Sequence, residues 1–218
     1  VPDVTVALGR LARHQLGRSS ARVVALTGSQ GKTSVKDLLA HVLAGSGPTI
    51  APTGSFNNEL GVPLTVLRLD ADTRYLVVEM GARGLGHIRT LCDIAPPTVA
   101  MVLNVGSAHL GEFGSTEAIA QAKGEIVEAL PASGVAVLNA DDHRVAAMAS
   151  RTAASVLTFG TTGAVTLGAV TLDAAGEPDL TLSHDGRTVA VHVPQVGAHH
   201  GINAAATAAA ALALGLEV

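Results

Sequence analysis

The stretch that decides the fold is residues 22–34, RVVALTGSQGKTS. Its first part, residues 22–26, is a mostly apolar run typical of a buried strand, and a helical pattern continues after it to Leu43. The glycines between them allow the backbone to curl, so that amide N–H groups and the positive helix end face phosphate oxygens. A strand, a glycine-rich loop and a helix in this order predict a phosphate-binding loop (P-loop).

Two side chains in this loop support the prediction, since Lys32 adds a mobile positive charge and the Thr33 hydroxyl can reach Mg²⁺. The spacing departs from the common pattern: Leu26 stands five residues before Gly31, where a glycine is usual, and Gly28 lies three before it. This spacing favours particular ATPase families over general kinases. A glycine-rich turn with an exposed lysine is the alternative left open. The residues expected to bind the nucleotide here are Gly28, Ser29, Gln30, Gly31, Lys32, Thr33 and Ser34.

The composition fits an α/β domain. Hydrophobic residues make up 48% of the 218 residues and aromatic residues only 2%, so the core must consist of aliphatic side chains, as in a parallel sheet covered by helices. A net charge of −4 without a run of Lys or Arg argues against a nucleic-acid or membrane-surface partner. The lone Cys92 excludes an intramolecular disulfide, and neither a signal peptide nor an apolar stretch of about 18 residues is visible. We expect a cytoplasmic, monomeric protein.

Strand-like and helical patterns alternate after the P-loop. This alternation predicts βαβ units and a mainly parallel sheet flanked by helices. The expected strands are residues 75–79, 99–105 and 135–139, and the expected helices are 62–69, 87–94 and 116–130.

The pattern changes after about residue 155. Short, partly alternating runs at 165–172, 179–183 and 188–193 are separated by the turn signals Ala175-Gly176 and Asp185-Gly186. They predict a small antiparallel β subsheet, packed against the end of the main sheet.

Helices are expected near both ends of the sequence. Apolar spacing predicts a leading helix at 4–16, and an Ala-rich helix at 202–214. We therefore divide the chain into a leading helix and linker at 1–21 and a nucleotide-binding domain at 22–218.

Two polar residues are expected at the carboxyl edge of this sheet, where ligands bind in open α/β folds. Glu79 ends the strand at 75–79, and its carboxylate suits Mg²⁺. A helix cap or a solvated charge is the usual role of such a residue, but the neighbouring P-loop favours a metal ligand. His109 follows the strand at 99–105 and could bind a second metal or touch phosphate; an ordinary loop histidine is equally compatible with the spacing.

Lys123 lies on the inward stripe of the helix expected at 116–130, between Ile119 and Ile126. A buried amine is costly unless it is paired, and its reference pKa of about 10.4 makes it a poor metal ligand. A lysine carbamate would instead behave as a carboxylate and could ligate Mg²⁺. From the residues alone, an ion pair with a buried acid is favoured.

Six motifs in a fixed order resemble the Mur ligase superfamily, and within it the branch that joins D-alanyl-D-alanine to a UDP-linked muramoyl tripeptide. The resemblance runs from about residue 23 to residue 214. The motifs are Thr-Gly-Ser-Gln-Gly-Lys-Thr-Ser at 27–34, Asn-Asn-Glu-Leu-Gly-Val-Pro at 57–63, Val-Glu-Met-Gly-Ala at 78–82, Asn-Val-Gly-Ser-Ala-His-Leu at 104–110, Ala-Lys-Gly-Glu-Ile at 122–126 and Leu-Asn-Ala-Asp-Asp at 138–142.

The resemblance implies roles for individual residues. Lys32 and Thr33 would hold the ATP phosphates and one Mg²⁺, which Glu79 would share. His109 and a carbamylated Lys123 would serve a second metal site. Lys32, His109 and Lys123 are the expected catalytic residues.

The resemblance also implies contacts with the rest of the nucleotide. Asn57 and Asn58 would line its pocket. Asn203 matches the second Asn of the family's His-Asn-x-x-Asn segment, which helps to hold adenine, whereas His200 stands where the first Asn is usual.

The implied reaction transfers the γ-phosphoryl group of ATP to a carboxylate of UDP-MurNAc-tripeptide, and the amine of D-Ala-D-Ala then attacks the acyl phosphate. Two cations and Lys32 would neutralise the charge that gathers as two anions meet. Family members carry an N-terminal UDP-sugar domain and a C-terminal domain for the amino substrate. The sequence leaves no room for either, so the chain alone is expected to bind ATP and Mg²⁺ with little or no ligase activity.

Three alternatives remain at the level of sequence. Folylpolyglutamate synthase uses the same phosphoryl chemistry, but the strings at 57–59 and 122–125 point away from it. A non-catalytic nucleotide-binding module would leave the inward Lys123 unexplained. A plain P-loop kinase is disfavoured by the position of Gly28 and by the extra polar residues His109 and Lys123.

Overall fold

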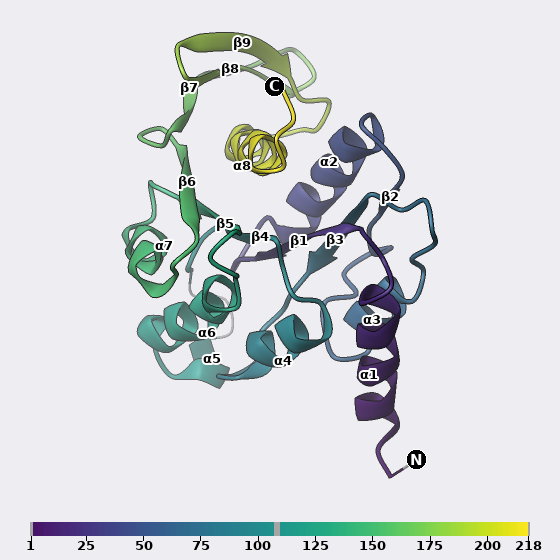
Figure 1. Ribbon diagram of the computed structural model, residues 1–218. Coiled ribbons are helices and arrows are strands. Elements are labelled where there is room, and N and C mark those ends of the chain that lie inside the picture. Colours follow the sequence, from purple (N-terminus) through teal and green to yellow (C-terminus); the bar gives the residue numbers. More distant parts are fainter. Residues whose placement is uncertain (1, 107–109, 218) are drawn as a thin grey trace.

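One nine-stranded sheet runs through the computed structural model, which describes residues 2–106 and 110–217 (Figure 1). The strand order is β2-β3-β1-β4-β5-β6-β7-β8-β9. Pairing is parallel from β2 to β7 and antiparallel between β7, β8 and β9. The predicted α/β class, with a mainly parallel sheet and antiparallel strands near the C-terminus, is confirmed.

The bounds of the elements follow the chain. The strands are β1 Arg22–Thr27, β2 Thr49–Ile50, β3 Tyr75–Glu79, β4 Val99–Val102, β5 Val135–Asn139, β6 Ser155–Gly160, β7 Val165–Leu172, β8 Pro178–His184 and β9 Arg187–His192. The helices are α1 Val4–Leu16, α2 Lys32–Ala44, α3 Gly61–Val66, α4 His87–Ile94, α5 Leu110–Phe113, α6 Thr116–Glu128, α7 His143–Ala146, the 3₁₀ helix η1 Ala147–Arg151 and α8 His200–Ala213.

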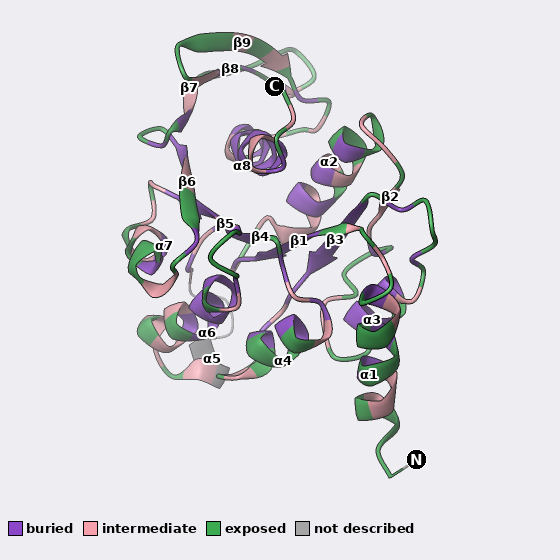
Figure 2. Cartoon of the chain, in the orientation of Figure 1, coloured by how far each residue is buried: buried purple, intermediate pink, exposed green. Residues whose placement is uncertain are grey.

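The central strands are buried on both faces, which explains their unbroken apolar sequences. In β1, Val23 and Ala25 belong to one hydrophobic cluster, whereas Val24 and Leu26 belong to the other. Side chains alternate between the faces of a strand, so only a strand covered on both sides needs apolar residues at every position. Figure 2 shows this middle part of the sheet as buried.

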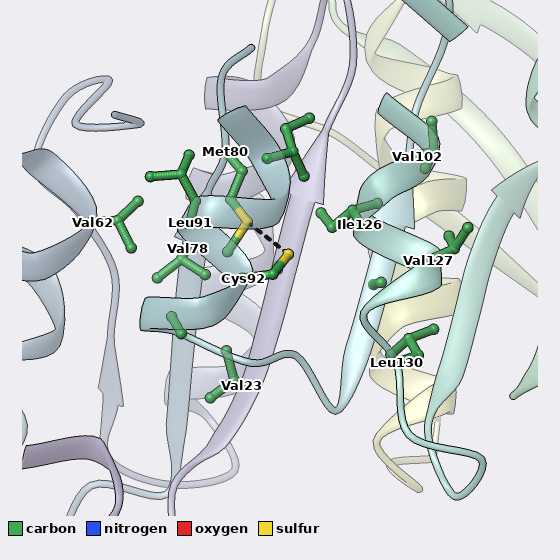
Figure 3. Close-up of a cluster of buried hydrophobic side chains, with 14 of the residues drawn as sticks. Val23, Val62, Val78, Met80, Leu91, Cys92, Val102, Ile126, Val127 and Leu130 are labelled. Atoms are coloured by element: carbon green, nitrogen blue, oxygen red, sulfur yellow. Dashed lines mark hydrogen bonds between the residues drawn. The ribbon is translucent and has the colours of Figure 1, made fainter. Parts of the chain in front are cut away.

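Helices form one layer on each side of the sheet. Figure 1 places α2 and α8 on one side and α1, α3, α4 and α6 on the other. Figure 3 shows part of the second layer, where Leu91 of α4 lies beside Val78 of β3 and Ile126 of α6 lies farther along the sheet, on the side of Val102 of β4. No helix within residues 2–106 and 110–217 combines the length and the apolar character that a membrane crossing requires.

Most predicted elements are confirmed, and several differ in their bounds. The strand expected at 99–105 ends at Val102, because the chain leaves the sheet there to form a loop over the P-loop. β2 and β6 were missed. Parallel pairing of β6 with β7, at Phe159 and Val165, makes the antiparallel strands a continuation of the main sheet rather than a separate layer packed against its end.

Replacing Leu39 tests the layer formed by α2. Leu39 is fully buried against the sheet, so Leu39→Ala should lower the free energy of unfolding by about 2–5 kcal/mol, measured by denaturant titration. The matched control is Leu64→Ala in α3, where the side chain is 49% exposed and a loss below about 0.5 kcal/mol is expected. Equal losses would contradict the packing described here.

Candidate nucleotide-binding site

The carboxyl ends of three adjacent strands meet at one edge of the sheet. β1 lies between β3 and β4, with Leu26 in register with Glu79 and Thr27 in register with Val102. Segments that follow these strands therefore begin side by side. An open α/β sheet binds its ligands at this edge, where the chain departs to opposite sides of a central strand.

The P-loop has the backbone that an anion site requires. Gly31 has a φ of 78°, in the left-handed region that favours glycine, and α2 begins directly after it. In the described part of the chain, no side chain caps this 13-residue helix, so the amide N–H groups of its first turn, including that of Ser34, are available to an anion. A Cβ atom added at Gly31 would lie 3.0 Å from Asn203 Oδ1.

A lysine and a carboxylate of opposite charge lie near the loop. Lys32 Nζ donates to the carbonyl oxygen of Gly28 at 2.8 Å. Burial lowers the pKa of Lys32, and the nearby Glu79 carboxylate opposes this shift. Glu79 is only 1% exposed, which rules out the solvated surface charge that the sequence left open.

Both carboxylate oxygens of Glu79 accept a hydrogen bond. Oε2 accepts from Thr33 Oγ1 at 3.1 Å, and Oε1 accepts from Asn57 Nδ2 at 2.7 Å. The sequence predicted that Thr33, Asn57 and Glu79 belong to one site, and the structure brings them together.

Lys123 is buried in α6, as its place on the inward stripe predicts, and is 6% exposed. Burial lowers its pKa to about 8, and the positive charge of Lys32 contributes to the shift, so the two amines belong to one electrostatic environment. Among the acids whose side chains the structure describes, which do not include Glu112, none pairs with Lys123. Glu125, the buried acid nearest in sequence, instead accepts the amide N–H groups of Gly86 and Arg89. His109 lies outside the described residues.

Asn104 is a site residue that the sequence reasoning did not single out. Its Oδ1 accepts the amide N–H groups of Ser29 and Gln30, both at 2.9 Å, and its Nδ2 donates to the carbonyl oxygen of Gln30 at 3.2 Å. Its position directly after the apolar run at 99–103, at the start of the quoted motif at 104–110, was the available signal.

A second set of missed residues supports the loop that carries Asn104. Asp142 accepts the amide N–H of Val105 at 2.7 Å, and Asn139 Nδ2 donates to the carbonyl oxygen of Leu103 at 2.8 Å. Asp142 also caps α7 through its other oxygen. The motif at 138–142 therefore fixes the loop after β4 over the P-loop.

Two further predicted residues, Asn58 and Asn203, make different contacts. Asn58 Oδ1 accepts the amide N–H of Gly61 at 2.9 Å, so it caps the start of α3. Asn203 is buried in α8 behind Gly31, and its Nδ2 lies 3.4 Å from Nδ1 of His200. Asn203 thus packs against the P-loop, although the two are far apart in the sequence.

A family model described as the Mur ligase middle domain matches residues 26–211. The chain belongs to this Mur ligase family. The match begins in β1 and ends in α8, so it includes the P-loop, Glu79 and Lys123.

Relatives of this Mur ligase domain cover its whole length. The UDP-N-acetylmuramoyl-tripeptide--D-alanyl-D-alanine ligase of Mycobacterium tuberculosis (strain ATCC 25618 / H37Rv) is 50% identical over 220 residues, which are 99% of this chain and 43% of the relative. MurF from Acinetobacter baumannii superposes with a TM-score of 0.95 at 36% identity, covering 100% of this chain and 48% of that one. MurF ligase from Thermotoga maritima, in complex with ADP, gives 0.91 at 34% identity, covering 100% and 51%. The chain spans less than half the length of the first relatives.

Replacing Gly31 tests the packing of the P-loop on α8. Gly31→Ala should lower the free energy of unfolding by more than about 1 kcal/mol, because the added methyl group meets Asn203 in addition to the strained φ. Gly186→Ala is the matched control: its φ is 77° and no described atom lies within 4 Å of the added Cβ. Denaturant titration should give the smaller loss for the control, and the reverse order would contradict the contact.

Proposed function

We propose that this chain is the ATP-binding part of a ligase that joins D-Ala-D-Ala to UDP-MurNAc-tripeptide. The observation that carries the proposal is a P-loop followed by a helix start without a side-chain cap, where Thr33 contacts the buried carboxylate of Glu79 and Lys32 lies in the field of that carboxylate. The names of the relatives supply the reaction and its substrates, which are those of proteins more than twice as long. Folylpolyglutamate synthase is disfavoured as an alternative by the 50% identity to that relative.

The oxygen atoms of Thr33 and Glu79 fit a Mg²⁺ site. They lie 3.1 Å apart, and both are the hard oxygen ligands that this ion prefers. When bound, Mg²⁺ would neutralise charge on the phosphates of ATP. His109 and a carbamylated Lys123 remain our assignment for a second metal.

The chain's own residues bind and orient the phosphates. Amide N–H groups of the loop and of the first turn of α2 would surround them, and Lys32 would place its ammonium group against the γ-phosphoryl group. That group passes to a carboxylate oxygen of the tripeptide and leaves ADP. The amine of D-Ala-D-Ala then forms the amide bond and releases phosphate and a proton. The phosphorylation step is needed because a carboxylate is a poor electrophile.

The nucleotide pocket includes three asparagines in this proposal, Asn57, Asn58 and Asn203. Their contacts with the P-loop differ. Asn57 touches Glu79 and Asn203 lies beside Gly31, so both adjoin the P-loop. Asn58 caps α3, and its side-chain oxygen is engaged there. We therefore assign Asn58 to shaping the pocket, and Asn203 to the adenine side of it.

Lys123 is proposed to carry a carbamate. Its amine is buried on α6 near the positive charge of Lys32, and both effects disfavour the ammonium form. A neutral amine attacks CO₂ to give the carbamate and a proton. The resulting anion would lie in the field of Lys32.

Calorimetric titration with ATP and Mg²⁺ tests the P-loop. The wild-type chain should bind ATP in preference to GTP, and Lys32→Ala should weaken ATP binding by about tenfold or more, because a charge-assisted contact is lost. Arg187→Ala, an exposed change in the distant β8–β9 hairpin, is the control and should bind as the wild type does. Equal binding by Lys32→Ala would contradict the proposal.

Carbon-13 NMR with labelled bicarbonate tests the carbamate. Lys32, Lys36 and Lys123 are the only lysines, so a carbamate signal absent from Lys123→Met identifies its site. The signal should grow between about pH 7 and about pH 8.5, because burial lowers the pKa of Lys123 to about 8 and only the neutral amine reacts. A signal shared with the variant belongs to Lys32, Lys36 or the terminal amine, and a spectrum without any difference would exclude a carbamate at Lys123.

A further inference from the structure

A second lysine of α2 is fully buried and has no part in the reaction above. Lys36 lies one turn after Lys32 and is 1% exposed. Its Nζ donates to the carbonyl oxygens of Pro52 at 3.0 Å and Gly54 at 2.9 Å, and lies 2.8 Å from Asp37 Oδ1. An ammonium group has three N–H donors, and burial requires that each has an acceptor. Two of the three acceptors here belong to a single loop.

This segment, residues 52–58, connects β2 to α3 and is called the 52–58 loop below. Its far end is fixed to β3 and the residues after it. The carbonyl oxygen of Asn57 accepts the amide N–H of Gly81 at 2.8 Å, and Asn57 Nδ2 donates to Glu79 Oε1 at 2.7 Å. The loop is therefore held by Lys36 at one end and joined to the Glu79 carboxylate at the other.

Helix α2 contacts both the 52–58 loop and Glu79, and these two also contact each other. Thr33, three residues before Lys36 on the same helix, donates to the other carboxylate oxygen of Glu79 at 3.1 Å. One oxygen of Glu79 is thus fixed by the 52–58 loop, and the second faces Thr33. A carboxylate whose two oxygens are fixed from opposite sides cannot rotate without breaking a hydrogen bond.

We propose that Lys36 is a positioning residue that sets the orientation of the Glu79 carboxylate toward a divalent cation. It acts through the 52–58 loop and Asn57, which together present Glu79 Oε2 beside Thr33. The inference rests on the proposed function, since it takes Glu79 and Thr33 as the cation-binding oxygens. Groups that orient a metal-binding carboxylate contribute to metal affinity without touching the ion.

A purely structural role for Lys36 predicts a different result. Replacing a buried charged group by an apolar one of similar volume is often neutral or stabilising when packing is preserved. Lys36→Met would then alter the melting temperature alone. The positioning role instead predicts a change in the response to a cation.

The experiment measures how strongly Mn²⁺ tightens the binding of ADP. Calorimetry gives the dissociation constant of ADP in excess Mn²⁺ and again in a chelator, and the ratio of the two is the Mn²⁺ factor. For Lys36→Met we expect this factor to fall about tenfold, while ADP binding in the chelator changes by less than about twofold. Asp37→Asn is the matched control. Its side chain is 60% exposed and it leaves both loop carbonyls bound to Lys36, so the wild-type factor is expected.

Two further measurements follow the path through the loop. Asn57→Ala should reduce the Mn²⁺ factor by a similar amount, and Lys36→Met combined with Asn57→Ala should reduce it no further, because both act through one carboxylate. Hydrogen exchange at residues 52–58 should speed up in Lys36→Met.

The outcomes separate this inference from the proposed function. If either folded variant keeps the wild-type Mn²⁺ factor, the positioning role is wrong while the P-loop assignment stands. If Lys36→Met does not fold, Asn57→Ala alone decides in the same way. If the wild-type chain binds ADP without any Mn²⁺ effect, the assignment of Glu79 and Thr33 fails, and this inference fails with it.

Discussion

The parallel alignment of β1, β3 and β4 is the constraint on which the site depends. Because Leu26 pairs in register with Glu79 and Thr27 with Val102, the segments after these strands start at the same level of the sheet. The P-loop, the buried carboxylate and the Asn104 loop are brought together by backbone hydrogen bonds, before any side chain is considered. A shift of two residues in one pairing would move Glu79 by about 7 Å and separate it from Thr33.

The features that sequence reasoning recovered are those encoded by short-range patterns. A strand buried on both faces forms a nearly continuous apolar run, so β3 and β5 were predicted with their observed bounds. The helical period likewise placed Lys123 on the inward stripe of α6, where it is 6% exposed. The place of Glu79 beside the P-loop could be inferred from its position at a strand end, and its role as a metal ligand stays a prediction. The assignment of His109 stays a prediction.

The features that were missed depend on contacts between residues far apart in the sequence. Asn104 and Asp142 are types that usually cap helices or form turns, so neither stood out until the fold brought Asn104 to Ser29. Lysines of helices are usually exposed, and the burial of Lys36 depends on its contact with the 52–58 loop, which the sequence pattern does not show. β2 has only two residues, too few for a periodic signal, and the joining of β7 to β6 rests on two residue pairs.

The contact between Gly31 and Asn203 also determines when the site can be completed during folding. Gly31 precedes Asn203 of α8 by 172 residues, so it leaves the ribosome well before its contact does. Such a non-local contact carries a large loop-closure entropy and forms late. β1 and α2 can therefore assemble while the chain is being synthesised, but the back of the P-loop stays open until α8 docks on α2. A nascent chain would not bind nucleotide with full affinity before α8 is in place.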